Sequence, residues 1–201
     1  MTFKVCGLKI QITFMFVALL ALVITLKAPT SLMLTIITSL LHECGHLIIM
    51  VITNKKPQVL RFELTGINII RTQNTNISLK NELFIALGGP IINATLFILC
   101  CFLLSVYENE TLMTFACINL ILLTFNLLPI KRLDGGMALY FLLSQKLETD
   151  LCRRIMQIIS CCFICLVYMW GFYVLVSTHY NLSVLIVAIF LTLSMFSCNE
   201  Y

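Results

Sequence analysis

Charged residues are scarce in this sequence, and that scarcity limits what the chain can be. Asp, Glu, Lys and Arg make up 11% of the 201 residues and hydrophobic residues 60%, whereas an average soluble domain is about 25% charged. A globule of this size has too little interior to hide so much apolar surface from water. The composition therefore excludes a water-soluble protein and predicts an all-α polytopic membrane protein, with one domain over residues 1–201.

Six apolar stretches are each close to the roughly 20 residues that a membrane-spanning helix needs. They predict helices over residues 10–26, 31–52, 83–106, 112–130, 155–176 and 182–197. We expect the first stretch to be retained as a span, because it lacks a convincing small-residue site for signal-peptide cleavage.

The basic residues predict how these spans are oriented in the membrane. If the N-terminus is cytoplasmic, all of the 13 Lys and Arg residues except Lys27 fall in cytoplasmic segments, as the positive-inside rule requires. The sequence thus predicts two cytoplasmic termini in a cell membrane, with a bacterial one favoured. The same placement accounts for the net charge of +4, so we expect no nucleic-acid partner.

Histidine is rare too, because the chain has only 3, and two of them lie in one apolar span. His42 and His46 are four residues apart in the stretch LLHECGHLII, so a helix places both on one face. Two imidazoles at this spacing can bind one Zn²⁺, and Glu43 can reach a water on the same ion. Ionisable groups at mid-membrane cost roughly 2.5–3.5 kcal/mol each on insertion scales. A metal site therefore explains the pattern better than chance burial or helix–helix hydrogen bonding.

A catalytic zinc site needs a third protein ligand, and Asp134 is the acidic residue best placed to supply it. Asp134 follows Pro129, which must disturb the fourth predicted span because it removes a backbone donor. Gly135 and Gly136 come next and permit close approach of the backbone. The alternative is that Asp134 is a helix N-cap for the segment GGMALYFLLSQ, since Asp is favoured at that position.

Polar residues in three predicted spans lie at similar depth. At a rise of 1.5 Å per residue, His46, Asn93 and Asn126 lie about 13, 20 and 8 Å along their helices from the nearest cytoplasmic lysine. Polar residues that lay in the spans by chance would be found at unrelated depths across the bilayer. The common layer in the cytoplasmic half therefore favours a shared site.

The polar segment between the second and third spans predicts a small β-hairpin. Apolar and polar residues alternate in LRFELT, residues 60–65, which is typical of a half-buried strand. Gly66 and the residues after it predict a second strand. We hypothesise that this membrane-associated hairpin pairs edge-on with an extended substrate; a simple surface hairpin is the alternative.

Three motifs in this order resemble the signature set of the site-2 proteases, which are zinc intramembrane metalloproteases. They are HECGH at 42–46, GGPIIN at 88–93 and NLLPIKRLDGG at 126–136. The resemblance covers residues 30–145 as a catalytic core, to which the remaining predicted spans are additional. The opening segment looks like the first span of the compact sporulation branch, which processes a sigma-factor precursor.

This resemblance implies roles for six residues: zinc ligands His42, His46 and Asp134, the catalytic acid/base Glu43, and the substrate- or water-positioning Asn93 and Asn126. It implies one Zn²⁺ per chain and cleavage of a membrane-spanning or membrane-tethered protein near the cytoplasmic face, with a regulatory membrane protein as a further partner. The alternative is a non-proteolytic zinc-binding membrane protein or transporter. A transporter would be expected to spread polar residues across the bilayer, whereas the external half here is nearly bare of them.

Overall fold

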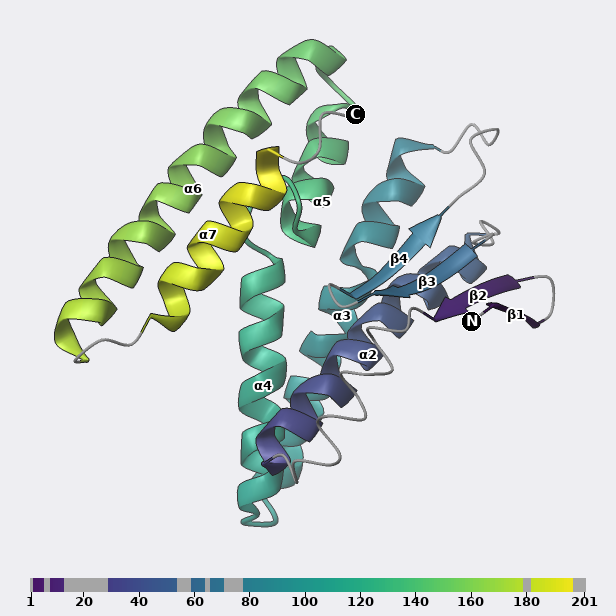
Figure 1. Ribbon diagram of the computed structural model, residues 1–201. Coiled ribbons are helices and arrows are strands. Elements are labelled where there is room, and N and C mark those ends of the chain that lie inside the picture. The colour runs from purple at the N-terminus through teal and green to yellow at the C-terminus, as the bar shows by residue number, and fades with distance from the viewer. Residues whose placement is uncertain are drawn as a thin grey trace. The chain divides into compact units, whose positions relative to one another are not determined.

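The computed structural model describes residues 2–5, 8–12, 29–53, 59–63, 66–70, 78–178 and 182–196, and the structural statements below concern those residues. Contacts divide the chain into two compact units, Met1–Thr124 and Phe125–Tyr201. Each unit is described by itself, with the elements labelled as in Figure 1.

Two long apolar helices dominate the N-terminal unit. Helix α2 spans Thr30–Ile52 and helix α3 spans Leu79–Leu104, close to the helices expected over 31–52 and 83–106. With 23 and 26 residues, both are long enough to cross a membrane. Helix α4, Glu110–Asn126, has 17 residues and ends earlier than the expected 112–130. Its end lies three residues before Pro129, in keeping with the helix-breaking effect of proline.

Helices α2 and α3 pack at very short range through glycine. A Cβ atom added to Gly88 would stand 2.7 Å from the Gly45 carbonyl oxygen, and one added to Gly45 would collide with the Gly88 carbonyl. Any side chain on either residue would therefore push the two backbones apart. Small residues serve the same purpose at many helix crossings in membranes. Here they bring the backbone of α3 directly against the turn of α2 that holds the histidines.

The N-terminal unit also contains a four-stranded sheet with the order β1-β2-β3-β4. The segment expected to form a hairpin is present as β3, Val59–Glu63, and β4, Gly66–Ile70, which pair antiparallel. Strands β1, Thr2–Val5, and β2, Leu8–Ile12, were not expected, and β2 pairs parallel with β3. Strand β3 therefore lies inside the sheet, and of this hairpin only β4 has an edge open to a further strand.

The C-terminal unit contains three helices. They are α5, Asp134–Leu143, α6, Thr149–Ser177, and α7, Ser183–Phe196; α6 and α7 lie side by side in Figure 1. Their core is formed by Ile130, Ile164 and Leu191, all buried. The segment before α5 is fixed to α6, because the backbone N–H of Lys131 donates to the Ser160 hydroxyl at 2.9 Å.

The helices agree with a multi-pass membrane protein, although the number of spans stays a prediction. Among the described residues, α2, α3 and α6 are long and apolar enough to cross a membrane, while α4, α5 and α7 are shorter apolar helices. Helix α6 begins six residues before the expected 155–176. Most of the expected first span, 10–26, lies outside the described residues, and β2 overlaps its first positions.

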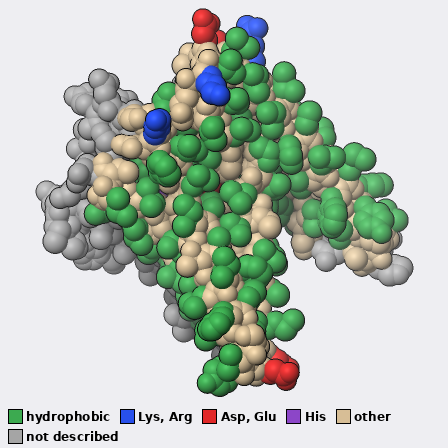
Figure 2. Space-filling model, turned by 180° about the vertical axis from the view of Figure 1, so that it is seen from behind, with side chains coloured by type: hydrophobic (Ala, Val, Ile, Leu, Met, Phe, Trp, Pro, Cys, Tyr) green, Lys and Arg blue, Asp and Glu red, His purple; other side chains and the backbone are tan. Residues whose placement is uncertain are grey.

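Exposed apolar side chains cover the helices, as lipid contact requires. On the face shown in Figure 2, hydrophobic side chains occupy most of the described surface, and Lys, Arg, Asp and Glu are few. On α6, Met169, Trp170 and Tyr173 are 70%, 66% and 70% exposed. In water such a continuous apolar surface would aggregate, whereas in a bilayer it contacts acyl chains.

The glycine contact between α2 and α3 predicts an unequal effect of two alanine substitutions. Gly45→Ala forces the helices apart and should destabilise the protein by about 1–3 kcal/mol, which lowers the thermal midpoint by about 2–4 °C per kcal/mol. Gly171→Ala is the control, because its Cβ would meet the Leu185 side chain at 3.1 Å and the Leu185 backbone nitrogen at 3.3 Å, neither of which is as close as the collision of a Gly45 Cβ with the Gly88 carbonyl. Thermal unfolding in one detergent compares the two variants. Equal midpoints for them would contradict the close approach.

Candidate metal centre

His42 and His46 lie one turn apart on α2 and point to the same place. Both are buried, with 6% and 8% of their surface exposed. Their Nε2 atoms are 3.3 Å apart, and the rings meet edge to face with centroids separated by 5.0 Å. Two nitrogen donors therefore converge within the reach of one ion, because a Zn–N bond is about 2.0–2.1 Å long.

The second nitrogen of each ring is held by α3. Nδ1 of His46 lies 2.7 Å from the carbonyl oxygen of Ile85, and Nδ1 of His42 lies 3.0 Å from the side-chain nitrogen of Asn93. Pro90 lies in the same region of α3 and lacks the N–H that would continue the helical ladder. Hydrogen bonds at the non-ligating nitrogen are what fix the orientation of metal-binding histidines in proteins.

Gly89 leaves room for an ion in front of the two rings. A Cβ atom on this glycine would stand 2.5 Å from Nε2 of His42 and 2.5 Å from Nε2 of His46. A side chain would thus fill the place where both nitrogen lone pairs are directed. The absence of a side chain, together with the two imidazole donors, fits a zinc ion held by both Nε2 atoms.

Asp134 is the first residue of α5, and it is buried. The cap position belongs to Leu133, and no side chain makes a capping hydrogen bond there, so the structure does not favour the N-cap alternative. Cβ atoms added to Gly135 and Gly136 would collide with the carbonyls of Leu127 and Ile130. The two glycines therefore allow the segment after α4 to fold tightly against the start of α5. Asp134 is thus buried, as His42 and His46 are, and the joint role of the three as metal ligands stays a prediction.

The structure places the other three expected site residues, Glu43, Asn93 and Asn126, without testing their roles. Glu43 is half-buried beside His42 on α2, and Asn126 is half-buried as the last residue of α4. Asn93 is fully buried, and its amide contacts His42. Their functional roles stay predictions.

Sequence reasoning missed Ile85 and the role of Gly89. The motif GGPIIN marked this turn of α3 as unusual, but only the helix crossing shows which glycine faces the histidines.

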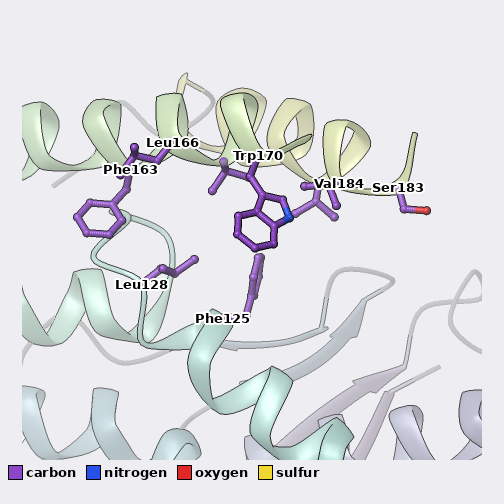
Figure 3. A pocket seen from close by; sticks show the side chains of 9 residues that line it. Phe125, Leu128, Phe163, Leu166, Trp170, Ser183 and Val184 are labelled. Carbon is purple, nitrogen blue, oxygen red and sulfur yellow. The ribbon is translucent and has the colours of Figure 1, made fainter. Parts of the chain in front are cut away.

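A cavity in the C-terminal unit is lined almost wholly by hydrophobic side chains. It has a volume of about 500 Å³ and lies beside α6 and α7, with Phe125, Phe163 and Trp170 among its walls (Figure 3). Ser183 is its only lining residue that is not hydrophobic, and none of the described lining residues is a metal ligand or an acid.

Two known proteins are similar to this chain, one in sequence and one in fold. No protein-family profile matches the chain. It is similar to stage IV sporulation protein FB of Bacillus subtilis (strain 168), with 30% identity over 159 residues that cover 78% of this chain and 54% of that protein. Its fold is similar to that of a site-2 protease from Methanocaldococcus jannaschii, with a TM-score of 0.69 and 21% identity, over 100% of this chain and 95% of that one. The chain is thus similar in sequence to the sporulation protein and similar in fold to a site-2 protease.

The chain spans about half the length of the Bacillus sporulation protein that it matches. The similarity therefore concerns the shared part of the sequence and the fold. The activity, substrate and partners of this chain are separate questions.

We expect Gly89→Ala to abolish metal binding. The added methyl group would lie 2.5 Å from both Nε2 atoms, closer than van der Waals contact allows. Zinc content of the purified protein, measured by elemental analysis, should fall from about one ion per chain to near zero. Gly171→Ala is the matched control and should keep its zinc. Full zinc content in Gly89→Ala would contradict the position inferred for the ion.

Proposed function

We propose that the protein is a zinc-dependent intramembrane endopeptidase that cleaves a membrane-spanning or membrane-tethered protein near the cytoplasmic face. The observation that carries this proposal is the pair of buried Nε2 atoms 3.3 Å apart on an apolar helix. Ionisable groups within membrane-spanning segments are costly and mark functional sites. A hydrolytic site also agrees with the site-2 protease whose fold this chain resembles.

His42, His46 and Asp134 are the proposed ligands of one zinc ion per chain. Two imidazoles and one carboxylate match the ligand set of catalytic zinc sites, which keep a fourth position open. A bound zinc ion supplies Lewis-acid polarisation of a peptide carbonyl and makes a water acidic enough to react near neutral pH. All three side chains are buried, so few competing groups from solvent reach the ion.

Glu43 is the proposed acid and base. It follows His42 directly on α2 and is half-buried, so its carboxylate can face the site while keeping access to water. In this role the carboxylate accepts a proton from the attacking water and then delivers it to the leaving amine. Asn126, at the end of α4, is proposed to contact the substrate backbone.

The cytoplasmic placement rests on charge distribution. Among the described cations, Lys131, Arg153 and Arg154 lie close in sequence to the ends of α4 and α6, and the positive-inside rule assigns such segments to the cytoplasm. The lipid bilayer is the proposed surrounding of both the protein and its substrate. A bacterial cell membrane is the proposed location, and a regulatory membrane protein is a proposed further partner.

Glu43→Gln should separate binding from catalysis. The amide cannot accept the water proton, so cleavage should fall by roughly 10²–10⁴-fold, while zinc content stays at the wild-type value. Quantitative membrane proteomics of host cells carrying either form should reveal a single-span protein that accumulates uncut in the variant.

Glu110→Gln, at the exposed start of α4, is the matched control and should process that protein normally. Unchanged processing in Glu43→Gln would contradict the proposal and favour a non-proteolytic zinc protein.

Asp134→Ala should weaken zinc binding by more than about tenfold and reduce cleavage with it, because a ligand is removed. Asp150→Ala offers the control, since Asp150 is an exposed aspartate in the first turn of α6, just as Asp134 is in the first turn of α5. Zinc affinity is measured by competition with a chelator. If Asp134→Ala bound zinc with the affinity of the wild-type protein, Asp134 would not be a zinc ligand.

A further inference from the structure

Asn93 has two amide atoms in unequal surroundings. The side chain is fully buried on α3, and its Nδ2 atom lies 3.0 Å from Nδ1 of His42. Its Oδ1 atom is buried as well and has no hydrogen-bond partner among the described residues. A buried acceptor without a partner is unfavourable and uncommon in folded proteins. This amide therefore has an unused acceptor beside a candidate metal ligand.

The contacts of the two rings with α3 and with each other favour one arrangement of the ring protons. The Ile85 carbonyl can only accept, so Nδ1 of His46, at 2.7 Å, donates to it. Nε2 of neutral His46 is then an acceptor, and His42 Nε2, 3.3 Å away, is the donor. Nδ1 of His42 consequently carries no proton and accepts from Nδ2 of Asn93. The backbone N–H of Gly89 also points at Nδ1 of His46, at 3.4 Å. A protonated Nδ1 cannot accept from it, and the much shorter contact with the Ile85 carbonyl, at 2.7 Å, decides in favour of the protonated Nδ1.

Zinc binding through both Nε2 atoms needs a different arrangement on His42. A ligating nitrogen must present its lone pair, so the proton of a neutral imidazole moves to the other nitrogen. Nδ1–H of His42 would then face the Nδ2 group of Asn93, which places two donors opposite each other. A half-turn of the amide about its terminal torsion brings Oδ1 to that place and pairs it with Nδ1–H. This half-turn breaks only the hydrogen bond from Nδ2 of Asn93 to Nδ1 of His42. That bond is already lost once Nδ1 of His42 carries the proton.

We propose that Asn93 is a positioning residue that selects the tautomer of His42, its amide turning to present Oδ1 when Nε2 of His42 binds the metal ion. This inference rests on the proposed zinc site and concerns how one ligand is prepared for it. Asn93 then acts through His42 and not on the substrate. Outer partners of this kind, when mutated, change metal affinity by about 10–100-fold.

A role in packing alone predicts the opposite order of variants. Leu has the same branching and number of side-chain heavy atoms as Asn and suits an apolar interior, whereas Asp places a charge in it. If Asn93 only filled space, Asn93→Leu would be tolerated and Asn93→Asp would be the more damaging change. If Asn93 supplies an acceptor to Nδ1–H, Asp is the conservative replacement, because a carboxylate accepts at both oxygens. The ranking of the two variants thus distinguishes the two roles.

The test measures zinc affinity of the full-length protein in detergent by chelator competition. Asn93→Asp should bind zinc as tightly as wild type or more tightly, and Asn93→Leu should bind about 10–100-fold more weakly. Helical content and thermal midpoint are recorded for each variant. Affinity in Asn93→Leu equal to wild type, or lower affinity in Asn93→Asp than in Asn93→Leu, would overturn the proposal.

Asn119 provides a matched control within the same unit. It too is fully buried and has an Oδ1 atom without a hydrogen-bond partner among the described residues. Its Nδ2 atom donates at 2.8 Å to the Phe115 carbonyl of its own helix. Asn119→Leu and Asn119→Asp should therefore both keep zinc affinity within about threefold, well short of the effect of losing an outer partner. A loss in Asn119→Leu as large as in Asn93→Leu would overturn the assignment to His42.

A second measurement uses the wild-type side chains and does not depend on how the variants fold. With only 3 histidines in the chain, ¹⁵N-histidine labelling gives few signals, and His179→Gln leaves those of His42 and His46 alone. Nδ1 of His42 should change from an unprotonated to a protonated shift when zinc is added. An Nδ1 signal that is protonated before zinc, or unprotonated after it, would overturn the proposal. Absence of any zinc binding to this protein would instead refute the proposed function on which the inference rests.

Discussion

The contact between Gly45 and Gly88 is the constraint on which the metal centre depends. Because neither residue has a side chain, the backbones of α2 and α3 approach within contact distance beside the histidines. That approach places the Ile85 carbonyl and the Asn93 amide against the outer nitrogens of the two rings. A wider crossing would leave those nitrogens without partners in an apolar medium, where an unsatisfied polar group is unfavourable by several kcal/mol.

The membrane explains why the site is built from helix backbones. In lipid, a polar side chain has no water to satisfy it, so the protein has to supply every partner. Both nitrogens of each imidazole are engaged: one by α3, the other toward the opposite ring. This fixes the rings before any ligand arrives, which reduces the entropy lost on metal binding. A buried polar pair that is already oriented can serve as a ligand set within an apolar span.

The sequence predicted the parts of this arrangement that follow from local rules. Helical periodicity placed His42 and His46 on one face, and Pro129 indicated a break after α4, which ends at Asn126, three residues before the proline. Relations between distant segments were not accessible in this way. No local pattern indicates that the Ile85 carbonyl receives a histidine proton, or that Gly89, rather than its neighbour, faces the rings. Pairing of β2 with β3 likewise joins residues about 50 positions apart in sequence, and nonlocal pairing of that kind is set by tertiary contacts.

X-ray absorption at the zinc edge of the purified, zinc-loaded protein tests the central claim most directly. The account predicts one zinc ion per chain with two imidazole ligands and the remaining ligands oxygen, in a four-coordinate site. In His46→Ala the imidazole scattering should fall by half or the metal should be lost. Sulfur scattering from a cysteine, a single imidazole, or the absence of bound zinc would contradict it.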